Sequence, residues 1–201
     1  NAAQLESSQE LPAQARHKAR VIREQSQRIG RLVSDLNLAS KLEYELQPLH
    51  IAPFRPAAML RAAAAGVLNH GAGERVSGEM DIGPGAGVMW AGGDEALLRR
   101  AVDNLLRNSV RHNPGQIQLS LRLSVSEQQW CMTVQDNGSG LPEDVLQRLR
   151  RPQENALPSH GLGLVLVQQI VRAHGGTVCF ENTQPGLKVT LSFPRLAGEN
   201  G

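Results

Sequence analysis

Three short segments, in a fixed order along the chain, constrain its fold more than any other feature. They are Asn104–Asn108 (NLLRN), Asp136–Gly140 (DNGSG) and Gly161–Leu164 (GLGL). The first lies in a helical pattern, the second joins a strand pattern to a glycine turn, and the third places a glycine turn before a helix. A metal-binding amide, a base-reading acid and a phosphate-holding helix start are together what an ATP site requires.

The first segment places polar groups on one side of a helix. Asn104, Asn108 and Arg111 are spaced at i, i+4 and i+7, so they share a face. Asparagine is a mediocre helix former, and a solvated polar face is one interpretation of the pair. The functional interpretation is a side-chain carbonyl oxygen on Mg²⁺ beside nucleotide phosphates, with Arg111 as a phosphate contact. The rest of the circumference can enter a core: Leu97, Leu98, Ala101, Val102, Leu105 and Leu106.

The second segment begins with an acid at the end of a strand pattern. The Asp136 carboxylate can accept a hydrogen bond from an exocyclic amino group, such as that of adenine. Gly138 and Gly140 permit a tight turn and a close approach of the base. An ordinary Asx turn between a strand and a helix is the other interpretation.

The third segment opens a helix with two glycines. Free backbone amides after Gly161 and Gly163 can form an anion site, although a flexible helix start is the alternative. Leu166 stands where the third glycine of GxGxxG would be, so the segment is not a dinucleotide-binding fingerprint. The sequence contains no GxxxxGK[ST], which excludes a P-loop site.

Composition bounds the class of protein. Among the 201 residues, 40% are hydrophobic and 3% aromatic, so a core must rest on aliphatic side chains. The formal charge of +2 is too small to indicate a nucleic-acid partner. Cys131 and Cys179 lie in strand patterns without CxxC spacing, and we expect small buried residues. The sequence shows neither a secretory signal nor a run of about 18 apolar residues.

A long helix is predicted at the start of the chain. The stretch 13–46 has no proline and a single glycine, Gly30. Its apolar residues form two heptad series, which predict a long helix with one apolar stripe. We expect this stripe to be covered by a second copy of the helix together with a helix that is absent from this sequence. The series are Ile22, Ile29 and Leu36, and Leu32, Ala39 and Leu46. Pro48, Pro53 and Pro56 then mark a domain boundary.

Beyond this boundary, strand and helix patterns are interspersed. They predict strands at 50–54, 76–81, 88–91, 116–123, 130–135, 177–181 and 187–193, and helices at 57–68, 95–112, 142–150 and 161–174. Asp94 is the expected N-cap of the second helix, and 151–160 is expected to be a mobile loop. The predicted fold class is an α/β (α+β) two-layer sandwich, with a mixed, mostly antiparallel sheet and helices on one face.

Taken together, Asn104…Asn108, Asp136-x-Gly138-x-Gly140 and Gly161-Leu162-Gly163-Leu164 resemble the N box and two glycine boxes of sensor histidine kinases of two-component systems. These enzymes belong to the Bergerat-type (GHKL) ATP-binding superfamily. Residues 28–43 resemble the second helix of their dimerisation and phosphotransfer domain. The resemblance covers about 13–195 and implies that 1–47 is part of that domain and that 48–201 is the catalytic ATP-binding domain.

The resemblance also implies roles for residues. Asn108 would be the Mg²⁺ ligand and Asp136 the adenine reader; Asn104, Arg111 and His112 would line the phosphate end. Gly161 and Gly163 would form the hinge of a lid over the site. The implied nucleotide-binding set is Asn104, Asn108, Arg111, His112, Asp136, Gly138, Gly140, Gly161, Leu162, Gly163 and Leu164.

The implied reaction is transfer of the ATP γ-phosphoryl group to a histidine and then to an aspartate of a response regulator. ATP and Mg²⁺ are the implied cofactors, and a homodimer through the N-terminal helix is implied. The chain would be the cytoplasmic portion of a protein held in the bacterial membrane by upstream segments. Hydrolytic relatives carry a glutamate at the position of Asn104, and an amide cannot take a proton, so transfer is favoured over hydrolysis.

Three features depart from the family pattern. His17-Lys18-Ala19-Arg20 lacks the H-E-x-x-x-P setting, so the acceptor histidine is expected upstream of residue 1 and no catalytic residue is assigned within the chain. The phenylalanines often found before the lid are missing from 149–153, and Ser159 replaces a common glycine. Two alternatives remain: a non-catalytic nucleotide-binding and dimerisation module, or a serine kinase of the anti-sigma type, which would lack the heptad helix.

Overall fold

The computed structural model describes residues 13–44, 46–67, 75–113, 115–150 and 162–195. Its main sheet contains β2 (Val76–Ile82), β4 (Ile117–Val125), β5 (Gln129–Asp136), β6 (Thr177–Asn182) and β7 (Leu187–Pro194), in the order β2-β4-β5-β7-β6. Only the β2–β4 pair is parallel, and the other pairs are antiparallel. A separate two-stranded sheet pairs β1 (Ala52–Phe54) with β3 (Ala91–Gly93).

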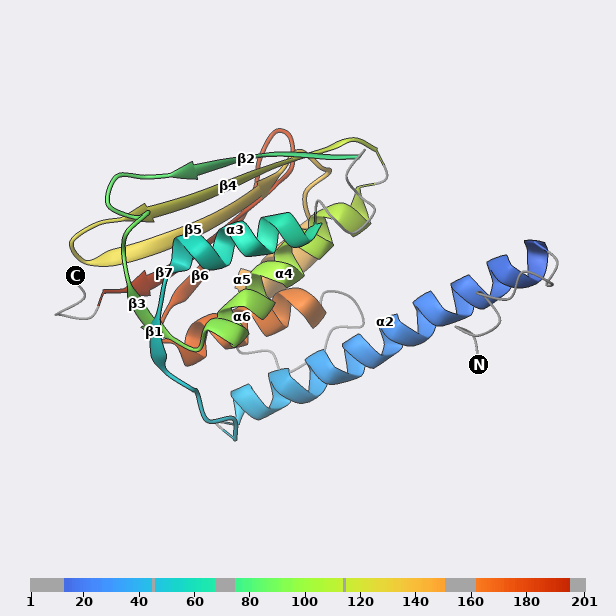
Figure 1. Cartoon of the computed structure of the whole chain (residues 1–201), viewed down its shortest axis with the longest axis horizontal. Coiled ribbons are helices and arrows are strands. Elements are labelled where there is room, and N and C mark those ends of the chain that lie inside the picture. The colour runs from blue at the N-terminus through green and yellow to red at the C-terminus, as the bar shows by residue number, and fades with distance from the viewer. Residues whose placement is uncertain (1–12, 45, 68–74, 114, 151–161, 196–201) are drawn as a thin grey trace.

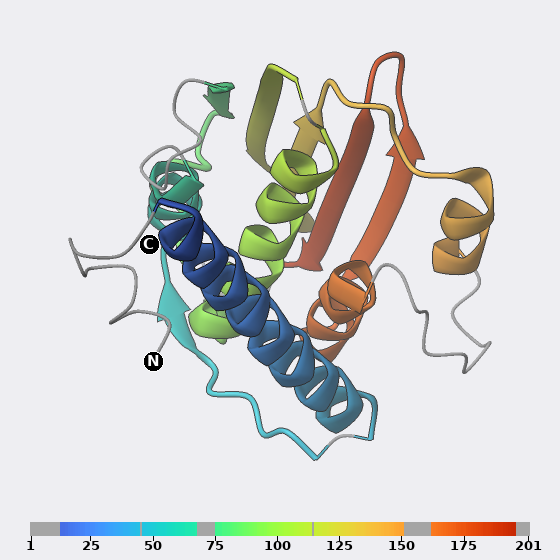
Figure 2. The same ribbon diagram turned by 90° about the vertical axis from the view of Figure 1, so that its right-hand side faces the viewer.

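The helices cover one face of the main sheet. They are α3 (Pro56–Val67), α4 (Glu95–His112), α5 (Glu143–Arg150) and α6 (Leu162–Ala173). The long helix α2 (Ala13–Glu43) crosses outside α4 and α6, on the side away from the sheet (Figures 1 and 2). The predicted sandwich is therefore confirmed, and α2 adds a third layer to it.

Alternation along the central strands builds the core and positions the site. In β5 the buried residues are Trp130, Met132, Val134 and Asp136, so a carboxylate occupies the last inward position of an otherwise apolar strand face. This face packs against α4 and α6, whose fully buried side chains include Leu98, Leu106, Leu166 and Val167. Trp130 stacks on Phe193 at 4.4 Å between ring centroids, at the opposite end of β5 from Asp136. The inward face of β5 therefore has an aromatic ring at one end and a carboxylate at the other.

Helix α2 divides its apolar residues between two environments. In its C-terminal half, Leu38, Ala39 and Leu42 are buried in the same core cluster as α4 and α6. In its N-terminal half, Ile22 and Ile29 stay 59% and 61% exposed. Of the residues of the apolar stripe, Ala39 therefore packs on the domain that follows α2, so the expectation that other chains cover the stripe is wrong at this position. Coverage of the exposed residues of the stripe by a second copy stays a prediction.

Two further sequence expectations need correction. The strand expected at 88–91 is found at β3, Ala91–Gly93, because pairing with β1 sets its register, with Ala91 opposite Phe54. Cys179 is exposed and Cys131 only half-buried, because both lie on the sheet face away from the helices; Cys131 contacts the Ser192 hydroxyl. The loop expected at 151–160 lies outside the described residues. Among those described, no helix is long and apolar enough to cross a membrane.

The start of α4 is fixed by the predicted cap. Asp94 is buried, its Oδ1 accepts from the Leu97 amide at 3.1 Å, and its Oδ2 accepts from the His50 amide at 3.1 Å. The Asp94 amide donates to His174 Nε2 at 3.0 Å, so the proton of this ring is on Nδ1, facing the Ile170 carbonyl oxygen. One residue therefore ties the entry to α4 to the C-terminal end of α6.

We expect Asp94→Ala to lower the free energy of unfolding by about 1–2 kcal/mol, because two backbone amides lose their acceptor. Urea denaturation would measure it. Asp81→Ala is the matched control: its carboxylate forms an exposed ion pair with Arg122, and its loss should cost less than about 0.5 kcal/mol. Equal losses for the two variants would contradict the role of the cap.

Candidate functional site

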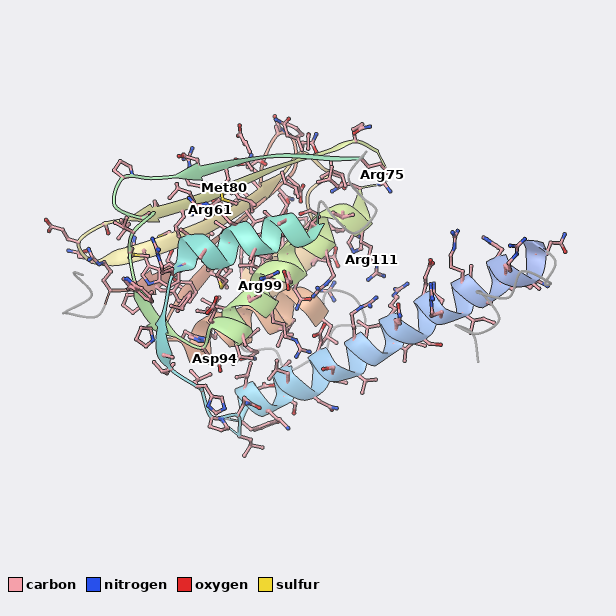
Figure 3. The ribbon with its side chains drawn as sticks, in the orientation of Figure 1. Arg61, Arg75, Met80, Asp94, Arg99 and Arg111 are labelled. Atoms are coloured by element: carbon pink, nitrogen blue, oxygen red, sulfur yellow. The ribbon has the colours of Figure 1, made fainter. Side chains whose placement is uncertain are left out.

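The predicted polar face of α4 exists, and its members differ in burial. Asn104 is 8% exposed, Asn108 is half-buried and Arg111 is exposed, near the opposite end of α4 from Asp94 (Figure 3). The opposite side of the helix enters the core through residues such as Leu98, Leu105 and Leu106. The apolar spacing of α4 thus turns its asparagines away from the sheet.

Asn104 carries an unsatisfied polar atom. Its Oδ1 accepts from Arg107 Nη2 at 2.7 Å, whereas its buried Nδ2 has no hydrogen-bond partner in the described part of the chain. A Cβ built on Gly163 would lie 3.8 Å from the Asn104 Cγ, so the first turn of α6 is its neighbour. The first amides of α6 are free of helix-internal partners, as at any helix start. An orphan amide and a helix N-terminus therefore meet, an arrangement suited to an anionic ligand.

The Asp136 carboxylate is held by three donors. Its Oδ2 accepts from the Ser109 hydroxyl at 2.6 Å, and its Oδ1 accepts from the amides of Gly138 and Leu187 at 2.9 Å and 3.2 Å. A carboxylate has about four lone-pair positions, so one acceptor position remains, on Oδ2. The residue is 5% exposed and fixed in direction by α4, the glycine turn and β7. It can accept one further hydrogen bond, as the amino group of a purine requires.

Two glycines of the second segment, Gly138 and Gly140, occupy positions where a side chain would be unfavourable. A Cβ at Gly138 would overlap the side-chain amide of Asn113, and Gly140 has a φ of +75°, a conformation that side chains disfavour. Asn182 closes the turn by bonding both backbone groups of Leu141, each at 2.8 Å. The glycine turn therefore lies directly against the C-terminal end of α4, at a distance that a side chain on Gly138 would not allow.

Positive groups gather at the C-terminal end of α4. Partial desolvation at this exposed position and then the charge of Arg28 lower the pKa of Arg111. Burial, Arg111 and Arg28, in that order, lower the pKa of His112 below its ordinary value. These effects favour the neutral form of the His112 ring, whereas a nearby anion would favour its protonated form.

The structure brings together the described members of the predicted set. Asn104 borders the α6 start with Gly163; Asn108, Arg111 and His112 continue along α4; Asp136 and its turn lie at the adjoining strand end. The Leu164 side chain is buried in the core, so it does not line the site, and Leu162 begins α6. Gly161 lies outside the described residues. The assignment of these residues to a nucleotide stays a prediction.

Sequence reasoning missed Ser109, Asn113, Asn182 and the Leu187 amide. The burial of Ser109 could have been predicted from the sequence, because this polar residue shares the apolar face of α4 with Leu98, Val102 and Leu105. The other three are brought to the turn by chain segments whose pairing only the tertiary fold determines.

Comparison with known proteins gives the class. Residues 93–197 match the family model of histidine kinase-, DNA gyrase B- and HSP90-like ATPases. This match spans half of the chain, and the chain belongs to that family. Its curated relatives are sensor histidine kinases, which confirms the resemblance inferred from the three segments.

One relative is the probable sensor histidine kinase TcrY of Mycobacterium tuberculosis, 34% identical over 192 residues, which are 91% of this chain and 39% of the relative. Another is the sensor histidine kinase YvrG of Bacillus subtilis, 27% identical over 194 residues, 92% of this chain and 33% of the relative. The chain therefore spans less than half the length of these relatives.

Solved structures share the fold at low identity. Full-length ShkA in complex with AMPPNP matches with a TM-score of 0.74 and 22% identity, over 98% of this chain and 42% of that one. The histidine kinase ThkA in complex with the response regulator TrrA matches with a TM-score of 0.73 and 15% identity, over 96% of this chain and 55% of that one. Both matches extend across α2 as well as the sandwich.

We expect Ser109→Ala to lower the free energy of unfolding by about 1–2 kcal/mol, because the buried Asp136 carboxylate loses one of its three donors. Chemical denaturation would measure the change. Ser124→Ala, at an exposed position of β4, is the control and should leave stability unchanged. A Ser109→Ala protein as stable as the control would show that the bond to Asp136 contributes nothing to folding.

Proposed function

We propose that the chain is the ATP-binding catalytic part of a sensor histidine kinase. It binds ATP and transfers the γ-phosphoryl group to a histidine outside this sequence, from which the group passes to an aspartate of a response regulator. The single observation that carries the proposal is the buried Asp136 carboxylate with one free acceptor position, directed by three donors beside the asparagine face of α4.

Each side chain has a task in this proposal. Asp136 accepts from the amino group of adenine and fixes the base, and Asn104 and the start of α6 line the phosphate end. Asn108 would hold Mg²⁺, which neutralises phosphate charge when bound. Asn104 cannot deprotonate water, so hydrolysis is disfavoured relative to transfer. The relation to sensor histidine kinases, and a solved neighbour with its response regulator, support this reading over a serine kinase of the anti-sigma type.

We also propose the division of the chain and its assembly. Residues 1–47 would be part of a dimerisation and phosphotransfer domain, and 48–201 the catalytic domain. The homodimer would form through the exposed apolar residues of α2, which are Val21, Ile22, Ile29, Leu32 and Val33. A longer protein would carry the acceptor histidine and the membrane segments.

The test is binding followed by transfer. The chain should bind ATP in a Mg²⁺-dependent manner and phosphorylate in trans a supplied domain that bears the acceptor histidine. Asp136→Asn should weaken binding at least about tenfold, because its NH₂ group would face the amino group of adenine while the carbonyl oxygen still serves the turn amides. The control is Asp81→Asn, on the exposed side of β2. Calorimetry and radiolabel transfer are the measurements.

Three outcomes separate the readings. Binding with transfer supports the kinase. Binding without transfer would favour the non-catalytic module. Absence of binding by folded wild-type chain, or equal binding by Asp136→Asn and Asp81→Asn, would reject the nucleotide site itself.

The lowered pKa of His112 predicts a pH dependence. Bound phosphates would raise this pKa, so binding takes up a proton and affinity should rise as the pH falls from 8 to 6. His112→Gln should lose this part of the dependence. The measured quantity is the ratio of wild-type to His112→Gln affinity at each pH, because protonation of the nucleotide itself cancels in it. A ratio that does not change with pH would show that His112 lies away from the phosphates.

A further inference from the structure

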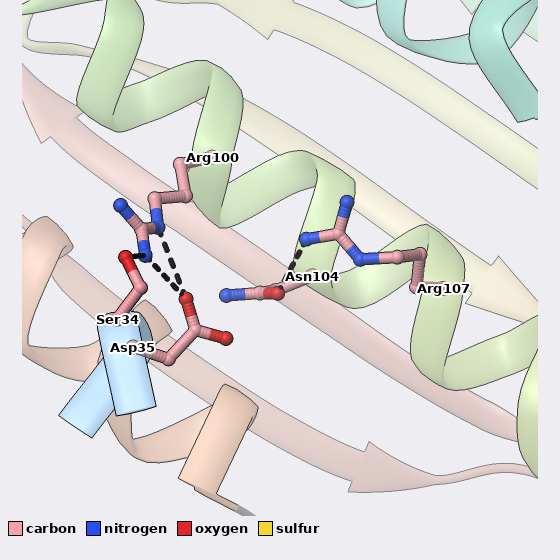
Figure 4. Close-up of polar contacts among 5 residues, drawn as sticks. All are labelled: Ser34, Asp35, Arg100, Asn104 and Arg107. Carbon is pink, nitrogen blue, oxygen red and sulfur yellow. Dashed lines mark hydrogen bonds and ion pairs between the residues drawn. The ribbon is translucent and has the colours of Figure 1, made fainter. Parts of the chain in front are cut away.

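Helix α2 crosses outside α4 (Figure 2), and Ser34 and Asp35 of α2 lie beside Arg100 and Asn104 of α4 (Figure 4). Its described anchor is Arg100, which lies one turn before Asn104 on the same face. Arg100 Nε and Nη2 donate to Asp35 Oδ1 at 3.0 Å and 2.7 Å, and Nη2 also donates to Ser34 Oγ at 2.9 Å. In Figure 4 the unpartnered amide end of Asn104 points toward this Asp35 carboxylate.

This anchor is shielded from solvent. The side chains of Arg100 and Asp35 are 32% and 12% exposed, whereas Arg20 and Glu24, an ion pair on the outer part of α2, are 58% and 59% exposed. Leu38, Ala39 and Leu42 continue the contact on the C-terminal side of Asp35. A partly buried ion pair beside an apolar contact fixes a helix more firmly than a surface pair does.

A second point of approach lies at the other end of the site. Arg28 is seven residues before Asp35, so it shares the face of α2 that meets α4, about 10 Å along the helix. On α4, Arg111 is eleven residues after Arg100, about 16 Å along. Arg28 acts electrostatically on both Arg111 and His112. The two points of approach on α2, Asp35 and Arg28, thus lie near opposite ends of α4, and along α4 they bracket Asn104 and Asn108.

The charges at these two points differ. The Asp35–Arg100 pair is neutral as a unit, so it can hold α2 in place without opposing an anion. In the part of the chain that the structure describes, no carboxylate forms an ion pair with Arg28, Arg111 or His112. Mutual repulsion there disfavours the docked helix until an anion neutralises it.

We propose that α2 forms the outer wall of the phosphate end of the nucleotide site, and that Arg28 supplies it with a positive charge that binds the nucleotide phosphates. Asp35 acts as a positioning residue, because its ion pair with Arg100 holds α2 where Arg28 reaches the site. The inference rests on the proposed function and adds to it a phosphate-binding residue from outside the sandwich. It also makes nucleotide affinity depend on the docking of α2.

The first arm of the test compares Arg28→Gln with Arg16→Gln. Both residues are exposed and on α2, and Arg16 lies about 18 Å further along the helix, so the charge change is the same at a remote position. Arg28→Gln should bind the Mg²⁺ complex of a non-hydrolysable ATP analogue about five- to tenfold more weakly. Its affinity for adenosine, which has no phosphate, should stay at the wild-type value. Arg16→Gln should stay within about twofold of wild type for both ligands.

The second arm tests positioning through Asp35→Asn, with Glu24→Gln as the matched control on the exposed ion pair. Asp35→Asn should weaken binding of the triphosphate and increase hydrogen exchange of the α2 amides in the free protein. In the Asp35→Asn background, Arg28→Gln should have less effect than in the wild type, because Arg28 is no longer held at the site. Glu24→Gln should change none of these quantities.

Each outcome is decisive. Triphosphate affinity of Arg28→Gln within twofold of wild type, or equal weakening for triphosphate and adenosine, would overturn the inference and leave the proposed function standing. Full additivity of Arg28→Gln and Asp35→Asn would overturn the positioning role of Asp35. Failure of the wild-type chain to bind the triphosphate would overturn the proposed function, and this inference with it.

Discussion

The site depends on one buried carboxylate. Asp136 continues the apolar alternation of β5 into a position where burial of an unpaired charge would be costly. The structure meets that cost with a hydroxyl from α4, an amide from the glycine turn and an amide from β7. These bonds join three segments that are far apart in the sequence. They also fix the direction of the remaining acceptor position, which gives the site its specificity for a hydrogen-bond donor.

The other half of the site consists of hydrogen-bond donors and positive groups that have no acceptor among the described residues. Asn104 is buried with a free donor, the start of α6 has free amides, and Arg111 and His112 are held close to Arg28. A folded protein rarely leaves buried polar groups without partners. An anionic ligand would satisfy these groups together. The acceptor at the strand end and the donors along the helices thus form two chemically opposite ends of one site.

Helix α2 has one part packed on the domain of the site and another part with exposed apolar residues. Its exposed apolar residues are suited to a partner helix, whereas its C-terminal half is packed on α6 and joined to α4 by an ion pair. A helix with both kinds of contact transmits a change at one to the other, because the same rigid element takes part in each. The ion pair between Asp35 and Arg100 is the charged contact that links α2 to α4.

The sequence by itself determined the local features. Helical spacing placed Asn104, Asn108 and Arg111 on one face, alternation placed the strands of the hairpin, and Asp94 marked the start of α4, since each depends on residues only a few positions apart. The register of strands was harder to predict from the sequence. The strand expected at 88–91 is found at Ala91–Gly93, because its pairing partner β1 lies far away in the chain. Only the tertiary structure decided that Ser109 and Leu187 hold Asp136, and that α2 folds back across α4. Those contacts join residues 27 to 65 positions apart, and no local pattern encodes which distant groups will meet.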